Sequence, residues 1–406
     1  MGEAAAWPLT DVQAAYWLAR GDPDCPGIPG TNLFAEYDLP GAWLPFLQHA
    51  VRRLIDRHDA LRVVVTGGLQ RVLEEVPRYR LEMVDLRGVP SGEAEARLEA
   101  TWARLRHDAA PVDRWPLFQF VAHALDDGRV RLLVRIDKFL ADGESRLLLE
   151  RDLFAMLAEP AARLPAPDVS YAGCLDAARR AERSAAGSRA YWRGRARGLP
   201  PLLLPPAGAA PARGAGRTAF RAHPLLPADR WRRVRARAGA QRLTPSMVAI
   251  AALADAAAEI SGRTCFTLPL LGMQRPPDLP AAQKVIGNFT TLHLLEVTGA
   301  GATFADRAAG LRRRVLTDME HQGHSGYRLL RDLHRTRGGW PVVPPLTVAT
   351  TLEYRQRTAR DGEPAGPHRV LKASAHIRGE LSVLTVSEGP DGSLRLRCQV
   401  VDEAPP

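Results

Sequence analysis

Cysteine is scarce in this sequence, and metal-ligand patterns are absent from it. The four cysteines, Cys25, Cys174, Cys265 and Cys398, are isolated along the 406 residues, with no Cys-x-x-Cys pair and no His at zinc-ligand spacing. This distribution excludes a disulfide framework and a zinc site of the usual kind. It indicates structural thiols in a reducing compartment, so we expect a cytoplasmic protein.

Long apolar runs are also missing. No uninterrupted apolar stretch reaches about 18 residues, and the first residues lack a basic segment followed by an apolar one. We therefore expect neither a membrane span nor a secretory signal. The formal charge of +10 comes largely from Arg and is not accompanied by an RNA- or DNA-binding signature. It fits either a GC-rich coding bias or a basic face that attracts an acidic protein partner.

Length and composition predict a folded protein with more than one core. Hydrophobic residues make up 46% and charged residues 25% of the 406 residues, as is typical of globular proteins. A chain of this length usually forms two domains. A stretch rich in Pro, Gly and Ala at 199–216 lies near the middle. We predict an N-terminal lobe at 1–175, a connecting segment at 176–215 and a C-terminal lobe at 216–406.

The apolar periodicity predicts a mixed α/β fold in both lobes. In the first lobe, helices are expected from Thr10, at 44–57 and at 145–157, and a hairpin is expected from strands 118–124 and 129–137 around Asp126-Asp127-Gly128. In the second lobe, helices are expected at 227–240, 245–260 and 304–321, with strands at 265–271, at 290–297 and near the C-terminus.

The run Asp137-Lys138-Phe139-Leu140-Ala141-Asp142-Gly143-Glu144-Ser145 lies on the corner between the hairpin and the next helix. Two interpretations are open. Asp137, Asp142 and Ser145 converge on a cleft as reacting groups, or they are structural. In the structural case Asp137 ends a strand, Asp142 binds backbone amides or an Arg, and Ser145 caps the helix.

The spacing Asp-x-x-x-x-Asp-x-x-Ser resembles the hallmark of heterocyclization domains. These belong to the condensation superfamily of nonribosomal peptide synthesis, whose ordinary members carry His-His-x-x-x-Asp-Gly at this place. Further segments resemble the same subfamily in order, from Trp7 to Leu352. They begin at Trp7 (Trp-Pro-Leu-Thr-Asp-Val-Gln-Ala-Ala-Tyr), Arg57 (Arg-His-Asp-Ala-Leu-Arg), Asp113 (Asp-Arg-Trp-Pro-Leu-Phe), Leu199 (Leu-Pro-Pro-Leu-Leu-Leu-Pro) and Ile286 (Ile-Gly-Asn-Phe-Thr-Thr-Leu).

The resemblance implies an architecture and a way of delivering substrates. The fold would be two chloramphenicol-acetyltransferase-like lobes arranged as a V-shaped pseudodimer with a central tunnel. Acyl- and aminoacyl-carrier proteins would dock at its two ends and deliver substrates on phosphopantetheine arms, with no permanently bound cofactor. Asp137, Asp142 and Ser145 would be the catalytic candidates, with Asp142 the more structural of them. Lys138, Asn288 and Thr290 would contact substrate.

The ring-closing motifs of the family are altered here. In the family, a Thr in Pro-Val-Val-Phe-Thr-Ser and an Asp in Pro-Gln-Val-x-Leu-Asp are assigned to cyclodehydration. Here Ala349 falls at the Thr position unless the register slips by one onto Thr350, and Thr385 falls at the Asp position. Lys138 corresponds to the catalytic second His of ordinary condensation domains. Its side chain either pairs with Asp137 or points to solvent.

Taken together, the motifs predict a free-standing, heterocyclization-like condensation enzyme. It would join a carrier-bound acyl or aminoacyl thioester to an amine such as carrier-bound Cys, Ser or Thr, with the carrier proteins supplied in trans and ring closure left open. The alternative is a catalytically silent scaffold that recruits carrier proteins or a tailoring enzyme. Acyl transfer from coenzyme A ranks last, because that reaction normally needs the missing His.

Overall fold

The computed structural model describes residues 5–21, 31–107, 111–203, 217–299, 301, 303–337, 340–341, 343–352, 367–377, 382–389 and 391–402. The chain forms two compact units. The first contains Met1–Arg180, Gln274–Phe289 and Glu363–Gly379, and the second contains the remaining three segments. The division predicted from the sequence uses contiguous lobes. It therefore leaves out two short later segments, Gln274–Phe289 and Glu363–Gly379, that belong to the first unit.

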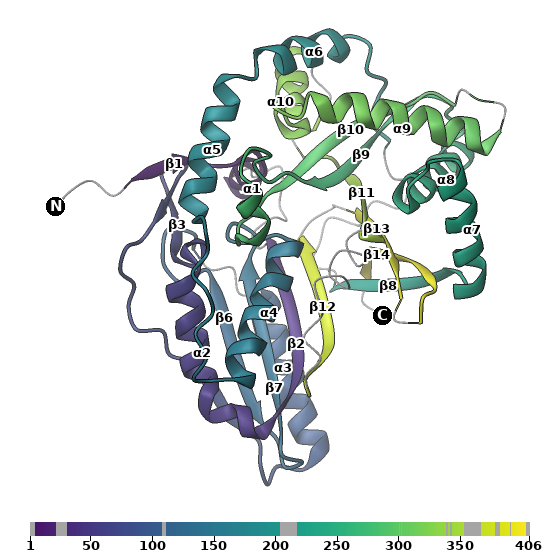
Figure 1. Ribbon diagram of the computed structural model, residues 1–406. Coiled ribbons are helices and arrows are strands. Elements are labelled where there is room, and N and C mark those ends of the chain that lie inside the picture. Colours follow the sequence, from purple (N-terminus) through teal and green to yellow (C-terminus); the bar gives the residue numbers. More distant parts are fainter. Residues whose placement is uncertain are drawn as a thin grey trace. The chain divides into compact units, whose positions relative to one another are not determined.

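The first unit is built on a mixed sheet with strand order β12-β2-β7-β6-β5 (Figure 1). The strands are β12 (Arg369–Ile377), β2 (Thr31–Pro40), β7 (Arg129–Asp137), β6 (Phe118–Ala124) and β5 (Glu82–Asp85). A second, small sheet contains β1 (Ala6–Pro8), β4 (Leu69–Val72) and β3 (Val63–Thr66). The predicted hairpin is confirmed residue for residue, with Asp137 at the end of β7.

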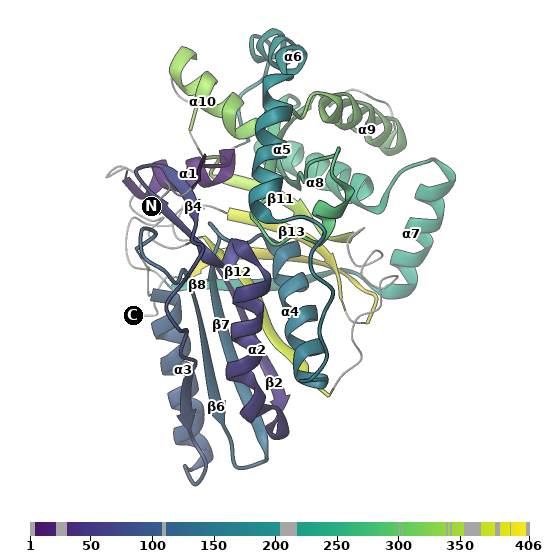
Figure 2. The same ribbon diagram turned by 60° about the vertical axis from the view of Figure 1, so that its left-hand side comes forward.

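Helices cover both faces of the five-stranded sheet, as Figure 2 shows. They are α3 (Ser91–His107) on one face and α2 (Leu44–Arg57) and α4 (Gly143–Ala158) on the other. Two further helices, α1 (Asp11–Gly21) and α5 (Tyr171–Arg183), lie outside these two layers. Successive side chains of a strand point to opposite faces. Accordingly Phe34, Val121 and Leu133 pack on α3, whereas their strand neighbours Leu33, Phe120 and Val134 face α2 and α4.

The second unit has a six-stranded mixed sheet with strand order β10-β9-β11-β13-β14-β8. The strands are β10 (Thr290–Val297), β9 (Phe266–Met273), β11 (Leu346–Thr350), β13 (Ser382–Glu388), β14 (Leu394–Asp402) and β8 (Arg217–Leu226). The helices are α6 (Ala186–Ala196), α7 (Ala228–Ala240), α8 (Pro245–Ser261), α9 (Phe304–Glu320) and α10 (Gly326–Arg337). The main core lies between α8, α9 and strands β9, β10 and β11.

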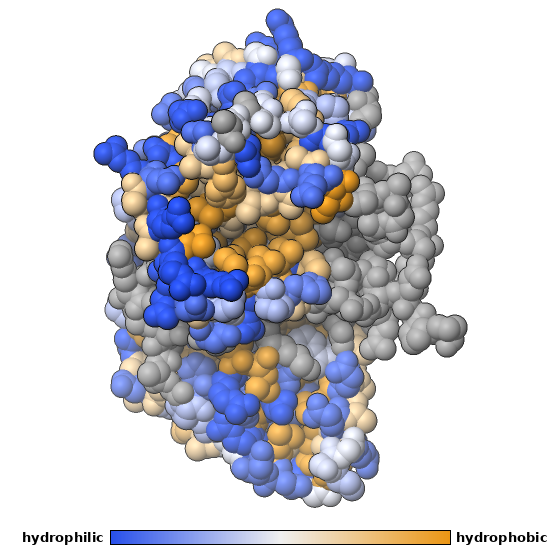
Figure 3. All heavy atoms as spheres, turned by 90° about the vertical axis from the view of Figure 1, so that its right-hand side faces the viewer, coloured by the Kyte–Doolittle hydropathy of each residue, from blue (hydrophilic) through white to orange (hydrophobic). Residues whose placement is uncertain are grey.

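The connecting segment expected at 176–215 is largely helical where the structure describes it. Most of α5 and all of α6 fall within it, and 204–216 lie outside the described residues. On the second unit, α7 exposes several arginines, and the apolar helix α8 that follows it exposes Ile260 (72%). Figure 3 shows hydrophilic and hydrophobic surface next to each other on this side of the molecule. Among the described residues, no single helix is long and apolar enough to cross a membrane. Only α7 and α8 together meet such a test, and they are bent by 103° at the break between them.

Candidate active site

The Asp137–Ser145 corner is built by a helix cap. Asp142 has an extended backbone, and its Oδ1 accepts a hydrogen bond from the backbone N–H of Ser145 at 2.8 Å. A carboxylate that accepts from the third residue of a helix is a strong N-cap. The cap of α4 is therefore Asp142, and the alternative that gave this role to Ser145 is wrong.

The same corner holds the loop at 286–289, which belongs to the same unit. Asp142 Oδ2 accepts from the backbone N–H of Phe289 at 3.0 Å. Ser145 Oγ donates to the carbonyl of Gly287 at 2.7 Å and accepts from the Gly287 N–H at 3.0 Å. Asp142 and Ser145 are both 0% exposed. Their polar atoms are thus engaged in joining two segments far apart in the chain.

Arg275 adds a buried charged contact between the Asp142–Ser145 segment and the segment that leads to the loop at 286–289. Its guanidinium lies 3.6 Å from Asp142 Oδ2, 2.8 Å from Glu144 Oε2 and 4.6 Å from the centre of the Phe289 ring. Its side chain is only 2% exposed. A buried guanidinium needs paired acceptors, and it also donates to the carbonyls of Ala282 and Val285. Nothing in the sequence around Arg275 indicates this role.

Asp137 is held by two contacts of its own. Its Oδ2 accepts from Arg20 at 2.7 Å, and its Oδ1 accepts from the backbone N–H of Phe139 at 2.9 Å. The carboxylate is 1% exposed, and the Arg20 guanidinium lies 4.8 Å from the Phe139 ring centre. The charge of Asp137 is therefore neutralised within the fold. Arg20 follows Tyr16 by four residues in α1, so both point to this corner from one helix face.

Lys138 differs from its neighbours in the motif. Its side chain is buried, with 7% of its surface exposed, and its Nζ lies 5.6 Å from the centre of the Tyr16 ring. Burial lowers the pKa of Lys138 to about 8, although the carboxylates of Asp142 and Asp137 act in the opposite direction. The expectation that Lys138 points to solvent is wrong. The ion pair with Asp137 is not formed either, among the residues that the structure describes.

Asn288 and Thr290 are separated by the division into units. Asn288 is 0% exposed and belongs to the first unit, where its amide donates to the carbonyl of Lys138 at 2.5 Å and its side chain is hydrogen-bonded to Tyr16. Thr290 is partly exposed and begins β10 of the second unit, with its hydroxyl 4.0 Å from Met273 Sδ. The structure therefore joins Asn288 to the motif within one unit and places Thr290 in the other.

Helix α1 contributes a further contact that the sequence interpretation missed. Gln13 is 0% exposed, and its Nε2 donates to the carbonyl of Phe139 at 2.7 Å. The same amide lies 3.2 Å from the Tyr171 hydroxyl. Gln13 belongs to the opening segment that resembles the family, so its position in that segment was the available signal.

The two threonines proposed for ring closure do not lie together. Thr385 on β13 is the register partner of Ala349 on the parallel strand β11. The Thr350 hydroxyl instead contacts the Ser246 hydroxyl of α8 at 2.5 Å. Leu346 and Val348, four and two residues before Thr350, face the core under α8. Because strand side chains alternate, Thr350 and Thr385 lie on opposite faces of the sheet.

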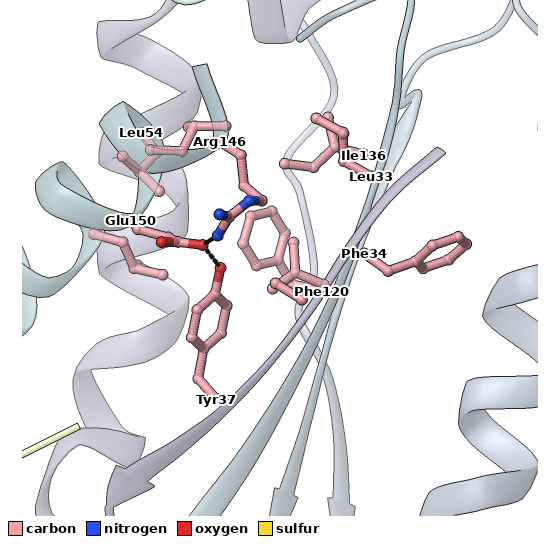
Figure 4. A pocket seen from close by; sticks show the side chains of 12 residues that line it. Leu33, Phe34, Tyr37, Leu54, Phe120, Ile136, Arg146 and Glu150 are labelled. Carbon is pink, nitrogen blue, oxygen red and sulfur yellow. Dashed lines mark hydrogen bonds and ion pairs between the residues drawn. The ribbon is translucent and has the colours of Figure 1, made fainter. Parts of the chain in front are cut away.

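A small cavity lies beneath α4, away from the motif (Figure 4). Its volume is about 20 Å³, which is room for little more than one water molecule. Beside it the Tyr37 hydroxyl donates to Glu150, which also pairs with Arg146. This buried polar contact fastens α4 to the sheet, and the cavity is no substrate site. Within the described part of the chain, no group of three or more His, Cys, Asp or Glu residues could hold a metal ion.

Two α/β units, one of which contains the capped Asp-x-x-x-x-Asp-x-x-Ser corner, are the features that define the class of this protein, and the comparisons identify its family. The model of the condensation domain matches residues 42–361. Pyochelin synthetase PchF of Pseudomonas aeruginosa is 32% identical over 386 residues, 91% of this chain and 21% of that protein. Phenyloxazoline synthase MbtB of Mycolicibacterium paratuberculosis is 33% identical over 397 residues, 92% of this chain and 33% of that protein.

Among solved structures, the cyclization-docking bidomain of the nonribosomal peptide synthetase EpoB from Sorangium cellulosum matches with a TM-score of 0.80 at 26% identity. The match covers 98% of this chain and 81% of that one. The chain belongs to the condensation-domain family of nonribosomal peptide synthetases, and the resemblance to its heterocyclization type is confirmed. It spans between a fifth and a third of the length of the two curated relatives.

Proposed function

We propose that this chain forms an amide bond between an acyl thioester and the amino group of a Cys, Ser or Thr residue, both delivered on the phosphopantetheine arms of carrier proteins. We further propose that it releases the linear amide without closing a ring. The observation that carries the proposal is the contrast between the Asp137–Ser145 corner and the positions that align with the family's ring-closing residues. The Asp and Ser side chains of the Asp137–Ser145 corner are hydrogen-bonded. The ring-closing Thr and Asp of the family, in contrast, align with Ala349 (or with Thr350 if the register slips by one) and with Thr385.

Amide formation from a thioester depends chiefly on holding two reactants in line. A rigid, buried corner suits this task. Asp142 and Ser145 fix the loop that contains Asn288, and Arg20 fixes Asp137. These residues act as positioning residues, because their polar atoms are engaged within the protein.

Ring closure has a further requirement. The tetrahedral adduct loses an oxygen as water, which needs a proton donor and a proton acceptor close to the ring. Ala349 has no polar side-chain atom, and the hydroxyl of Thr385 is not a base near neutral pH. Thr350 lies on the other face of the sheet, against Ser246. This argument supports a linear product.

The test is reconstitution with loaded carrier proteins supplied as separate polypeptides. An aromatic, an aliphatic and an aminoacyl donor are each paired with Cys-, Ser- and Thr-loaded acceptor carriers, and the acceptor is read by intact mass. The expected product has the mass of the donor acyl group added to the acceptor. A product lighter by one water overturns the linear outcome. No acyl transfer from any donor overturns the enzyme.

A silent scaffold remains the second candidate, because every polar atom of Asp142 and Ser145 that is described above has a structural partner. It predicts binding of loaded carriers without transfer. Carrier binding is therefore measured by titration in the same samples. Binding with no product in any pairing supports the scaffold, and product formation rejects it.

A further inference from the structure

Lys138 is the one residue of the motif whose titratable group has no structural partner among the described residues. Asp137 is paired with Arg20, Asp142 caps α4, and Ser145 binds both backbone atoms of Gly287. The Nζ of Lys138 makes no hydrogen bond or ion pair to any residue in the described part of the chain. The Nζ lies over the face of the Tyr16 ring, 5.6 Å from its centre.

The choice of residue at 138 is itself informative. Three of the 55 Lys and Arg residues are lysines, Lys138, Lys284 and Lys372, so 52 are arginines. A position that needed only a positive charge would be filled by Arg like almost all others in this chain. Arg cannot lose its proton in a protein, whereas a buried Lys can. The pKa of about 8 places that loss near physiological pH.

The surroundings of Lys138 suit a movable proton. The carboxylates of Asp137 and Asp142 keep the ammonium form accessible despite burial. Asn288 holds the Lys138 backbone through its carbonyl and also holds Tyr16, over which the Nζ lies. The ammonium end is therefore fixed by packing rather than by an ion pair, and it can gain or lose a proton without breaking one.

We propose that Lys138 is the catalytic proton-transfer residue of amide formation, an inference that rests on the proposed function. As the amine nitrogen attacks the thioester carbonyl and the C–N bond forms, neutral Nζ accepts the proton that the nitrogen loses. When the C–S bond breaks, the Lys138 ammonium gives this proton to the leaving sulfur. The thiol is released, and Lys138 is neutral again.

The test compares single-turnover rates of amide formation between pH 6 and 9.5 for Lys138→Met, Lys138→Arg and Lys138→His. The control is Lys284→Met, an exposed lysine of the same unit. We expect a loss of about 100-fold or more in the Met and Arg variants. The wild-type rate should rise with pH through about 8. The His variant should retain activity, with its rise moved to lower pH because imidazole titrates near 6.5.

A wild-type rate and pH profile in Lys138→Met would overturn the inference while leaving the proposed function intact. No product from the wild-type protein would instead reject the proposed function. A second measurement does not depend on activity. Labelling with ¹⁵N-lysine gives side-chain NMR signals from only three residues, and Lys138→Met assigns one of them. A titration midpoint near 8 for this signal supports the inference, and one near the ordinary value of 10.5 overturns it.

Discussion

Ser145 and Gly287 are 142 residues apart in the chain, yet the Ser145 hydroxyl donates to the carbonyl of Gly287 and accepts from its N–H. The Ser145 hydroxyl thus satisfies both backbone polar groups of Gly287, as the backbone of a neighbouring β-strand does in a sheet. The contact fixes the loop that carries Asn288 next to the motif corner. It also explains why the last residue of the motif is a small hydroxyl residue.

Replacing Ser145 with Ala is expected to destabilise the protein by about 1 to 3 kcal/mol, because the buried N–H of Gly287 loses its acceptor. The Gly287 carbonyl keeps a donor in the backbone N–H of Asp142. The measurement is the free energy of unfolding in urea. Ser184→Ala, at an exposed position, is the control and should change it by less than about 0.5 kcal/mol. Equal stability of the two variants would contradict this account of the contact.

Gly287 should tolerate no side chain. A Cβ at this position would lie 2.6 Å from two carbons of the Tyr171 ring and 2.7 Å from the Phe289 ring. Both rings are buried, so neither can move away freely. We expect Gly287→Ala to destabilise the protein by about 1 to 3 kcal/mol through overpacking. Gly92→Ala, in α3 with open space around it, should be neutral or stabilising. A neutral Gly287→Ala in a thermal unfolding assay would show that the loop is not held as described.

The ion pair between Arg20 and Asp137 should show strong coupling. Arg20→Met leaves a carboxylate that is 1% exposed without its charged partner, which is expected to destabilise the protein by about 3 to 5 kcal/mol. Asp137→Asn added to Arg20→Met should recover part of this loss, because the uncompensated charge is removed. Unfolding free energies of the wild type, the two single variants and the double variant give the coupling energy. Simple additivity would exclude the pair as a structural element.

Local patterns predicted the elements around the site well. The alternation of apolar residues on both sides of Asp126-Asp127-Gly128 was enough to place β6 and β7, and the pattern of 290–297 was enough for β10. Such patterns report the burial of one face of an element. They could not show α6, whose Ala- and Arg-rich sequence has a single buried residue, Trp192.

Contacts between distant segments were beyond the sequence. The partnership of Ser145 with Gly287 and that of Arg275 with Glu144 depend on how the loop before β10 returns to the first unit. The two expectations for Lys138 assumed that a charge is either paired or solvated. The structure buries it against an aromatic ring, which a motif alignment does not reveal. The register of β11 and β13, together with the alternation of side chains along a strand, shows that Thr350 and Thr385 lie on opposite faces of the sheet.

Ring closure is expected to return when its two missing groups are supplied. Ala349 and Thr385 are register partners on adjacent parallel strands, so Ala349→Thr with Thr385→Asp places a hydroxyl and a carboxylate side by side. A carboxylate can accept a proton near neutral pH, and the hydroxyl can donate one. The double variant, given a Cys-loaded acceptor, should yield some product lighter by one water. Thr350→Ala is the control and should give the wild-type product. A purely linear product from the double variant would show that these positions do not decide ring closure.

The buried ammonium of Lys138 should make the wild-type protein less stable than Lys138→Met at neutral pH. The pKa of Lys138 is lowered from 10.5 to about 8 in the folded protein, so below pH 8 burial of the ammonium opposes folding by on the order of 3 kcal/mol. Between pH 8 and 10.5 the unfolded chain binds more protons than the folded one, so wild-type stability should rise with pH relative to the variant. Urea unfolding of both proteins at pH 7, 8, 9 and 10 measures this difference, with Lys284→Met as the exposed-lysine control. A gap that narrows steadily above pH 8 is the expected result, and a gap that is constant with pH would mean that Lys138 keeps its proton in the folded protein.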